Sequence, residues 1–469
     1  MNQLSPYSPR YKPHIPNIPI QANRKAKPHR KIHSNTNASV PSPPPSNDTS
    51  INPRFRKHAG KNLLDNPASQ QLSPIIPNGP ISPQEAIETY SSIMTRYEAS
   101  EILNFPSVYF LGNFAKKREP IRNPKNNFGF DTNDHIYRLI IGDHLAYRFE
   151  VLSSFGSGAF GQVVKALDHK TGQHVAIKII VNTEQMHEQG QIEAKILARL
   201  NRRSCPNVVR AYDFFIFRSH ICITFEILGR NLYELIQLNQ YQPFPMIMVR
   251  TYALQIFQAL EGIHDAGIIH CDIKPENILI SNTQRNVVKI IDFGSGCFDG
   301  RQKYEYIQSR FYRAPEVVLG IQYGPPMDIW SAALVIVEML TGRALFPCNT
   351  EHELLVMITE MFGPPPIEVI KMSKRRKDFF DLKLGLKPIK GRICRPSSNS
   401  LQSVLNINDP NLIDFLTRCL AWNQKDRMTA KEALQHPWIQ TKVLSIQDQQ
   451  PAIQPSSTLP DLHNSQKVL

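Results

Sequence analysis

The 469-residue sequence has few of the features that mark secreted or membrane-spanning proteins. Its seven cysteines are odd in number, scattered and never spaced as CxxC, which argues against a disulfide framework and a zinc site and favours a reducing compartment. The longest apolar run, residues 331–340, contains Glu338 and is too short to cross a bilayer. The polar, proline-rich N-terminus lacks the apolar segment of a signal peptide. We therefore expect no membrane partner and a location in the cytoplasm, the nucleus or both.

Acidic residues are scarce at the N-terminal end of the chain. Residues 1–80 contain eleven Lys or Arg and two acidic residues, a net +9 of the +14 carried by the whole chain. The basic cluster at 24–31 is either a nuclear-import or nucleic-acid patch or a solvated basic tail. No aromatic residue interrupts it to stack on bases, so nucleic acid is not an expected partner. Residues 1–80 and 440–469 have too few large apolar residues to fold, and we predict that both tails are disordered.

Ordered structure is expected to begin near Ile81. Residues 82–103 repeat apolar residues at helical spacing, with Ser82 in the N-cap position and Glu85 three residues later. Strand-like segments follow, and beyond about residue 230 helical patterns take over. The predicted strands cover 135–141, 147–156, 162–168 and 174–180, and the clearest helical patterns cover 248–267 and 327–342, the second closed by Gly342. A strand-rich part therefore precedes a helical part, as in an α+β protein.

The stretch "GSGAFG", residues 156–161, is a GxGxxG pattern, which by itself is a weak signal. In a dinucleotide-binding fold this pattern opens a helix, whereas here the sequence continues as a hairpin. The glycines are therefore predicted to lie in a flap between two strands that closes over phosphates. Lys178 follows seventeen residues after Gly161, on a strand with Val175, Ala176 and Ile177, where a buried ammonium group needs an anionic partner.

A second group of polar residues carries the chemistry of phosphoryl transfer. In "IIHCDIKPENILI" (268–280) Asp272 lies five residues before Asn277, and Asp292 follows in "KIIDFGSG" (289–296). A base, an amide ligand and a carboxylate ligand for magnesium are what this reaction requires, because its catalysis is mostly positioning and charge neutralisation. A zinc site at residues 270–272 would need further ligands at matched spacing, which the sequence lacks.

Residues 149–439 resemble a eukaryotic protein kinase domain, because its motifs occur here in the same order. They are the flap, Lys178, Glu193 in "GQIEAKILARL", Asp272 with Asn277, "DFG" and "APE" (314–316). The resemblance implies a bilobal α+β fold, with an antiparallel, strand-rich N-lobe over 149–228 and a mainly helical C-lobe over 229–439. It also implies ATP and Mg²⁺ as the nucleotide and the metal.

The resemblance assigns a role to each matching position. Asp272 would accept the substrate hydroxyl proton, Lys274 would stabilise the transferring phosphoryl group, and Asn277 and Asp292 would hold magnesium. Lys178 would hold the α- and β-phosphates and pair with Glu193. The remaining positions implied for ATP are Gly156, Ser157, Gly158, Ala159, Phe160 and Gly161 of the flap, Val163, Ala176 and Leu279 around the adenine, and Phe225, Glu226 and Leu228 at the hinge.

Finer details resemble the dual-specificity tyrosine-regulated kinases, the DYRK family. These details are "HCD" at 270–272, the pair Tyr304 and Tyr306, and the stretches "IQSRFYRAPE", "NLYEL" and "HLAYRFEVL". Class 2 of that family fits best, because 83–119 resembles its N-terminal autophosphorylation accessory region and 127–152 its homology box, which together place these elements at 81–148. The sequence departs from the family at Ala333, usually Gly, at Gly296, usually Ser, and in a shortened insert at about 363–405.

The activation loop offers arginines that could bind a phosphate in place of the usual HRD arginine. That arginine pairs with a phosphate on the loop in other kinases, but Cys271 stands in its place. Arg310 and Arg313 follow Tyr306 by four and seven residues and are predicted to receive a phosphotyrosine as bidentate forks. The alternative is that both arginines only pack against the loop and Glu316.

The family resemblance implies that Tyr306 rather than Tyr304 is modified, beside Ser309 in the segment that receives substrate. We therefore expect an active kinase for Ser and Thr of protein substrates that phosphorylates its own Tyr306 during maturation, and we expect a monomer. The alternative is a catalytically silent scaffold, but silent kinases commonly lose one of the residues that this chain keeps. Ser-Pro pairs in the N-terminal region, at Ser5, Ser8, Ser42, Ser73 and Ser82, are either proline-directed sites or ordinary tail composition.

Overall fold

A computed structural model describes residues 79–121, 123, 125–282, 286–389 and 394–441. The chain divides into two units, Met1–Asn78 and Gly79–Leu469. The first unit lies outside the described residues, and with it the basic cluster and most of the Ser-Pro pairs. The predicted C-terminal tail also lies outside them, apart from its first two residues. The second unit is described below.

Among the described residues, six strands form one antiparallel sheet in the order β1-β2-β3-β4-β6-β5. Helix α4, Glu184–Arg203, packs against this sheet. Alternating buried and half-buried residues along β3 show why this stretch forms a strand with one face in a core. The strands are β1 His144–Leu145, β2 Phe149–Gly158, β3 Gly161–Asp168, β4 Gln173–Ile180, β5 Ala211–Phe217 and β6 His220–Phe225. Three of the predicted strands are confirmed as β2, β3 and β4.

The strand predicted over 135–141 is wrong. Tyr137 makes a single antiparallel bridge to Asp131, and the N–H of Arg138 donates to the carbonyl of Phe130 at 2.8 Å. Other backbone carbonyls of this segment accept from distant residues, that of Tyr137 from the Gln162 side chain and that of His135 from the N–H of Asn182, so the segment joins no strand ladder.

The single helix expected over 82–103 is also corrected. Ser82 does cap α1, Pro83–Tyr90, by accepting from the N–H of Glu85 at 3.1 Å. The helix then breaks into η1, Ser91–Ile93, and a new helix α2, Arg96–Glu101, starts at Thr95. Thr95 and Glu98 cap each other's backbone N–H groups in a capping box, which favours a fresh helix start over a continuous helix. The segments η2, Ile102–Asn104, and α3, Lys125–Phe128, complete this region.

Beyond the hinge the chain is mainly helical. The prediction for 327–342 is confirmed by α8, Pro326–Thr341, which is buried from Met327 to Leu340 and ends at Gly342 with φ +73°. A side chain at Gly342 would also overlap the backbone carbonyl of Tyr241, so glycine is required there. The prediction for 248–267 corresponds to α6, Met246–Asp265. The other helices are α5 Leu232–Leu238, α7 Pro315–Val318, α9 Glu351–Phe362, α10 Ile367–Met372, α11 Arg376–Phe379, α12 Leu401–Leu405, α13 Pro410–Cys419, α14 Ala430–Gln435 and α15 Pro437–Gln440.

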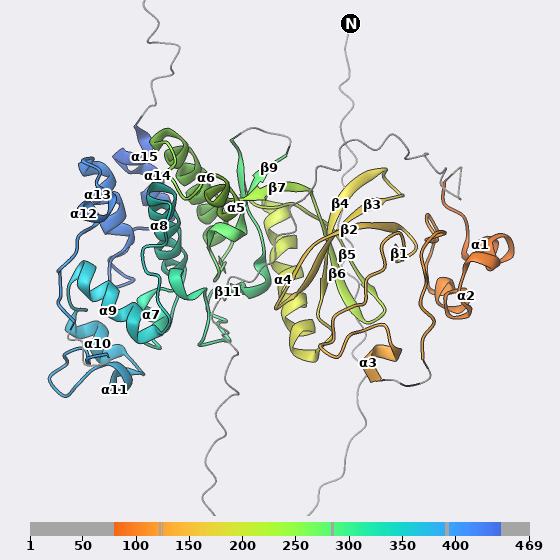
Figure 1. Cartoon of the computed structure of the whole chain (residues 1–469), viewed down its shortest axis with the longest axis horizontal. Coiled ribbons are helices and arrows are strands. Elements are labelled where there is room, and N and C mark those ends of the chain that lie inside the picture. Colours follow the sequence, from red (N-terminus) through yellow and green to blue (C-terminus); the bar gives the residue numbers. More distant parts are fainter. Residues whose placement is uncertain (1–78, 122, 124, 283–285, 390–393, 442–469) are drawn as a thin grey trace, which may run out of the picture. The chain divides into compact units, whose positions relative to one another are not determined.

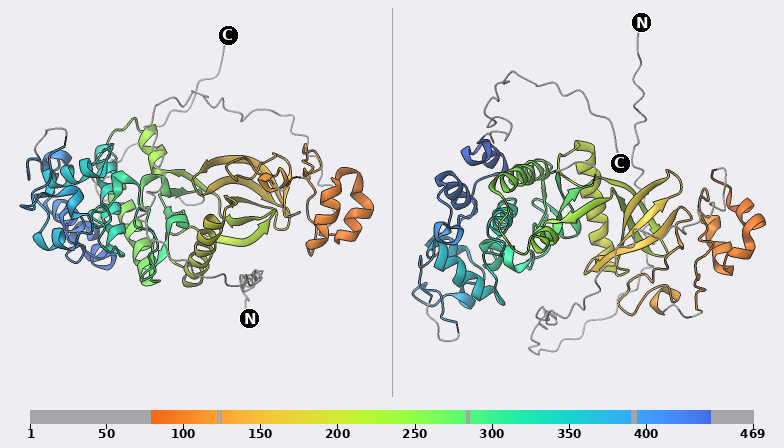
Figure 2. Two further views of the ribbon diagram at one scale, coloured as in Figure 1. Left: turned by 90° about the horizontal axis from the view of Figure 1, so that it is seen from below. Right: turned by 45° about the horizontal axis from the view of Figure 1, so that its top comes forward.

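Short strands line the boundary between the sheet and the helices. They are β7 Leu228–Asn231, β8 Ile268–Ile269, β9 Ile278–Ser281, β10 Val288–Ile290 and β11 Cys297–Phe298. The views agree that the six-stranded sheet and the helices from α5 onwards form two groups, with α1 and α2 beside the sheet and away from the helical group (Figure 1, Figure 2). This arrangement is the expected bilobal α+β fold. No helix in the part of the chain described here is long and apolar enough to span a membrane.

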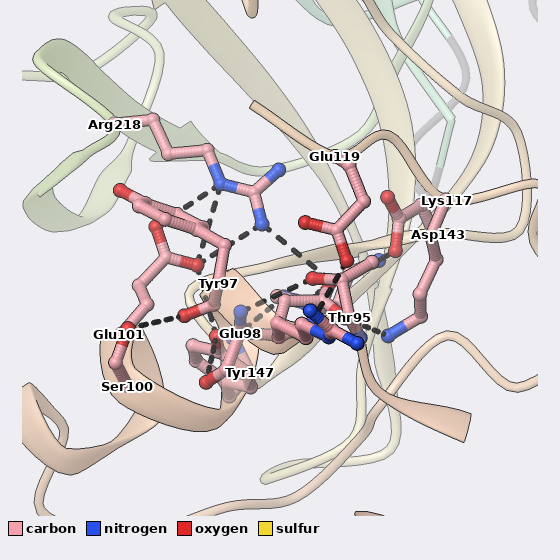
Figure 3. Close-up of polar contacts among 12 residues, drawn as sticks. Thr95, Tyr97, Glu98, Ser100, Glu101, Lys117, Glu119, Asp143, Tyr147 and Arg218 are labelled. Carbon is pink, nitrogen blue, oxygen red and sulfur yellow. Dashed lines mark hydrogen bonds and ion pairs between the residues drawn. The ribbon is translucent and has the colours of Figure 1, made fainter. Parts of the chain in front are cut away.

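Polar contacts fix α2 to the sheet (Figure 3). Arg218, in the turn between β5 and β6, donates to the carboxylate of Glu101 on α2 at 3.0 Å. The hydroxyl of Tyr147 donates to the same carboxylate at 2.9 Å. The Arg218 guanidinium also lies 4.4 Å from the centre of the Phe130 ring. These contacts hold α2 and the residues around Phe130 against the turn between β5 and β6.

Glu98 is the second acidic anchor of α2. It accepts from His144 Nε2 at 3.0 Å and from Lys117 Nζ at 2.8 Å. Burial opposes its charge, but these two partners outweigh burial and lower the pKa of Glu98 to about 2. Glu98, Asp143 and His144 are the one set of side chains in the described ranges that lie close enough to share a metal ion. Since Lys117 and His144 already occupy both oxygens of Glu98, we assign the set to docking.

Candidate active site

The glycine-rich flap is the turn between β2 and β3, as the sequence predicts. Gly156 and Gly161 have φ values of +151° and +142°, which side chains rarely adopt. A side chain at Gly161 would in addition overlap the carbonyl of Ile179. Ser157 and Gly158 end β2, and Ala159 and Phe160 form the turn itself, so backbone amides of this flap can approach a ligand closely.

Three predicted residues meet below the flap. Lys178 Nζ lies 2.7 and 2.9 Å from the two carboxylate oxygens of Glu193 on α4 and 2.7 Å from Asp292 Oδ1. Burial works against the charge of Lys178, but the carboxylates of Asp292 and Glu193 outweigh it and raise the pKa of the lysine. Burial likewise opposes the charge of Asp292, and the ammonium group of Lys178 lowers the pKa of Asp292 to about 2. Lys178 and Asp292 therefore stay charged near neutral pH, whereas burial raises the pKa of Glu193 against the opposing effect of Lys178.

A second group surrounds Asp272. Its Oδ2 accepts from Lys274 Nζ at 2.7 Å, and its Oδ1 accepts from the hydroxyl of Ser309 at 2.8 Å. Asn277 donates through Nδ2 to the backbone carbonyl of Asp272 at 2.8 Å. Burial lowers the pKa of Lys274, but the carboxylates of Asp272, Glu276 and Asp292 together raise it overall, so this lysine is charged. The activation loop thus brings a hydroxyl side chain against Asp272.

Asp328, on α8, holds the loop that carries Asp272 and was missed by the sequence analysis. Its carboxylate accepts from the backbone N–H groups of His270 and Cys271 at 2.9 and 3.0 Å and lies 3.0 Å from His264 Nε2. Cys271 has φ +67°, an unfavourable conformation that these bonds stabilise. The signal available in the sequence was an acidic residue at the start of a largely apolar helix.

The residues predicted around the adenine lie on β3, β4 and β6 of the sheet and on the paired strands β7 and β9. Val163, Ala176, Phe225, Leu228 and Leu279 are all half-buried, which leaves apolar surface for a flat ligand. The side chain of Glu226 instead pairs with Lys289 on β10 at 2.6 Å. A contact of Glu226 with a nucleotide would therefore have to use its backbone.

Tyr306 and the two predicted arginines lie together on the activation segment. The Arg313 guanidinium is 4.0 Å from the centre of the Tyr306 ring. Partial burial raises the pKa of Tyr306, but hydrogen bonds with Arg313 and Arg310 lower it overall. Arg313 is also anchored to the loop, because it donates to the carbonyls of Ile307 and Gln308 at 2.9 and 2.7 Å.

Two predicted residues of this segment have other neighbours. Glu316 forms a buried ion pair with Arg427 through two bonds of 2.7 and 2.9 Å. These bonds to its carboxylate come from Arg427 and not from Arg310 or Arg313. The backbone carbonyl of Tyr304 accepts from the hydroxyl of Tyr323 at 2.9 Å. The pair with Arg427 joins residues 111 positions apart, and no sequence spacing pointed to it.

Glu338 on α8 and Glu276, which follows Asp272 by four residues, form an acidic spot. The hydroxyl of Tyr312 donates to Glu338 Oε2 at 2.6 Å, and both side chains are buried. Burial, together with the charge of the nearby Glu276, raises the pKa of Glu338 to about 7. Burial, the neighbouring Tyr241 and the charge of Glu276 raise the pKa of Tyr233, which hydrogen-bonds Tyr241. The sequence analysis did not single out this group.

Comparison with known proteins agrees with this geometry. Residues 149–439 match the family described as "Protein kinase domain". The chain is 40% identical over 384 residues to the dual specificity tyrosine-phosphorylation-regulated kinase mbk-2 of Caenorhabditis briggsae, covering 77% of this chain and 47% of that one. It is 42% identical over 386 residues to a putative dual specificity tyrosine-phosphorylation-regulated kinase 3 homolog of Drosophila melanogaster, covering 77% and 46%. With the kinase 3 of Macaca fascicularis it shares 41% identity over 387 residues, covering 78% and 68%.

The matched span shows that the chain has a protein kinase domain. Within the protein kinases, the chain belongs to the dual-specificity tyrosine-phosphorylation-regulated kinases, as its motifs indicated. It spans about half the length of the first two relatives named above.

Proposed function

We propose that the chain is an ATP-dependent kinase that phosphorylates Ser and Thr of protein substrates and, during its own maturation, Tyr306. The observation that supports this most is the arrangement of two charged groups: Lys178, Glu193 and Asp292 below the flap, and Asp272 with Lys274 beside the activation segment. One group suits the phosphates of a nucleotide and the other a hydroxyl acceptor.

In this proposal Asp272 orients the acceptor and takes up its proton. The hydroxyl of Ser309 bonds Asp272 Oδ1 at 2.8 Å, which shows that a hydroxyl fits against this carboxylate. Lys274 lies 2.7 Å from the other oxygen of Asp272 and can stabilise charge on the transferring phosphoryl group. Lys178, held by two carboxylates, offers its ammonium group to the phosphates of ATP.

Asn277 and Asp292 fit the binding of magnesium. Asn277 uses Nδ2 for its bonds to Asp272, so that its amide oxygen is the atom that can bind a cation. Asp292 is ionised, and hard oxygen ligands of this kind suit Mg²⁺. When bound, the metal would neutralise the charge of the phosphates.

The backbone beside the acceptor supports a preference for proline after the target residue. Gln308 has φ +69°, and its carbonyl is taken by Arg313 at 2.7 Å. A substrate N–H at this point would find that acceptor already occupied, whereas proline has no N–H to satisfy. Peptides that differ only as Ser-Pro and Ser-Ala would test this preference, which a faster reaction of Ser-Ala would contradict.

The chemistry of the cysteines supports a reducing compartment such as the cytoplasm or the nucleus. All seven are free thiols, including Cys271 and Cys297, whose sulfur atoms are 3.8 Å apart. A reducing compartment would keep such a pair as two thiols.

The experiment that tests the proposed activity is phosphate transfer from radiolabelled ATP to myelin basic protein or casein, with and without magnesium. We expect transfer by the wild-type chain with magnesium and almost none by Asp272→Asn. Asp134→Asn, an exposed aspartate on the homology box, is the matched control and should keep full activity. Equal transfer by Asp272→Asn and the control would contradict the proposal, and so would a wild-type chain without activity.

A further inference from the structure

A pocket of about 520 Å³ lies in the helical group beyond the end of α8. Its walls come from the loop before α6, the segment after α8, α9 and α12. This volume is within the range of pockets that hold ligand groups in other proteins. Its apolar lining includes Tyr241, Leu345, Phe346, Met357, Met361 and Val404. The residues assigned above to ATP and to phosphoryl transfer are not part of it.

Two of the residues that line the pocket, Thr341 and Tyr241, have neighbours in or beside the acidic spot. Thr341 lines the pocket and follows Glu338 by three residues on the same helix, a rise of about 4.5 Å. Glu338 bonds Tyr312 of the activation segment at 2.6 Å. A second connection runs through Tyr233, which is close to Glu276 and hydrogen-bonds the pocket residue Tyr241. Glu276 and Tyr241 are exposed, so a peptide that runs from Asp272 past Glu276 and Tyr233 would reach the pocket at Tyr241.

The chemistry of the lining favours an apolar side chain with a polar rim. Val404 on α12 is 41% exposed, although it is a large aliphatic residue. The exposed side chain of Arg343 adds a cation at the edge. Glu360 also lines the pocket, so the lining carries one group of each charge type. An apolar group buried here gains about 25 cal/mol for each Å² removed from water.

We propose that this pocket is a docking subsite for the protein substrate, in which a large apolar side chain binds while the acceptor Ser or Thr lies at Asp272. The inference rests on the proposed kinase function and adds a determinant of which proteins it modifies. The occupant is a substrate segment and not a separate small molecule, because the pocket adjoins the proposed path of the substrate chain. Docking of this kind lowers KM by holding the acceptor at a high local concentration.

The test uses synthetic peptides with a fixed Ser-Pro acceptor and ten randomised residues on each side, phosphorylated by the full chain. We expect selection of a large apolar residue at one distant position. In Val404→Asp this selection should disappear, and KM for the selected long peptide should rise at least tenfold. A short peptide with three residues on each side of the acceptor should keep its KM and kcat. Leu382→Asp, at a fully exposed leucine outside the pocket, is the matched control and should behave as wild type.

A second measurement does not depend on the stability of Val404→Asp, because it uses the wild-type chain. The selected extension alone, without an acceptor, should inhibit phosphorylation of the long peptide by the wild-type chain and leave the short peptide unaffected. The same apolar selection in Val404→Asp, or an extension that inhibits neither peptide, would overturn the docking proposal. If the wild-type chain phosphorylated neither peptide, the proposed function itself would fail, which is a distinct outcome.

Discussion

Replacing Tyr306 by Phe isolates the contribution of the phosphate that Tyr306 is proposed to carry. The Tyr306 side chain is 58% exposed, and its ring lies 4.0 Å from the Arg313 guanidinium. Phenylalanine keeps this cation–π contact, which is worth about 0.5–1 kcal/mol at an exposed site. The variant therefore loses the hydroxyl and its phosphate while the packing of the ring remains.

The expected effect follows from the contacts that the phosphate could make. It would add about −1.5 to −2 charges and form one to three charge-assisted hydrogen bonds with Arg310 and Arg313. Each such bond is worth roughly 1.5–3 kcal/mol when shielded and less on a surface as exposed as this one. A net of about 1.4–2.8 kcal/mol corresponds to a 10- to 100-fold change in the population of the ordered segment. We expect kcat/KM of Tyr306→Phe to fall by that factor.

The assay combines mass spectrometry of the purified chain with peptide kinetics. Tyr304→Phe is the matched control and should reduce kcat/KM less than about twofold, since the contact seen for Tyr304 uses its backbone carbonyl. Phosphate on Tyr304 alone, or full activity of Tyr306→Phe, would refute the reasoning.

Arg313 has a structural role in addition to any bond with phosphate. It donates to the carbonyls of Ile307 and Gln308 and pairs with Glu351 at 2.9 Å. Arg313→Ala should therefore reduce the activity of the Tyr306→Phe chain further, where no phosphate is present. An unchanged rate in the double variant would show that these three bonds do not order the segment.

Two further predictions concern stability and maturation. Burial raises the pKa of Glu338 from its ordinary 4.5 to about 7. The ionised carboxylate therefore destabilises the fold above pH 7, by a free energy on the order of 3 kcal/mol. This cost disappears as the pH falls from 7 to 4.5. Glu338→Gln should therefore raise Tm more at pH 8 than at pH 4.5, and an equal change at both pH values would contradict the assignment. Deletion of residues 1–125 removes the carboxylate partners of Arg218, and we expect the truncated chain to carry little phosphate on Tyr306 by phosphotyrosine blot. Full modification of Tyr306 would show that the accessory region is not needed for maturation.

Local patterns in the sequence predicted the elements that position the site. The alternation of 162–168 and the closing Gly342 each reflect interactions within a few residues, which is why β3 and the end of α8 were predicted. The break between α1 and α2 was missed because the reciprocal capping by Thr95 and Glu98 competes with an apolar period that continues through it.

Contacts between distant segments could not be predicted. Asp328 and Arg427 bind backbone and side-chain groups more than fifty residues away, and nothing in their local sequence identifies those partners. The docking of Glu101 against Arg218 is of the same kind, since the two residues are separated by 117 positions. The direction in which Glu226 points depends on Lys289, which belongs to a different strand.

The turnover of Asp292→Asn tests the central claim most directly. Asp292 is ionised, bonds Lys178 at 2.7 Å and is the carboxylate proposed to hold magnesium at the phosphates. Loss of this ligand should remove several kcal/mol of transition-state stabilisation, so we predict that turnover falls about 1000-fold or more while circular dichroism shows an intact fold. Near-normal phosphorylation by a folded Asp292→Asn chain would contradict the account.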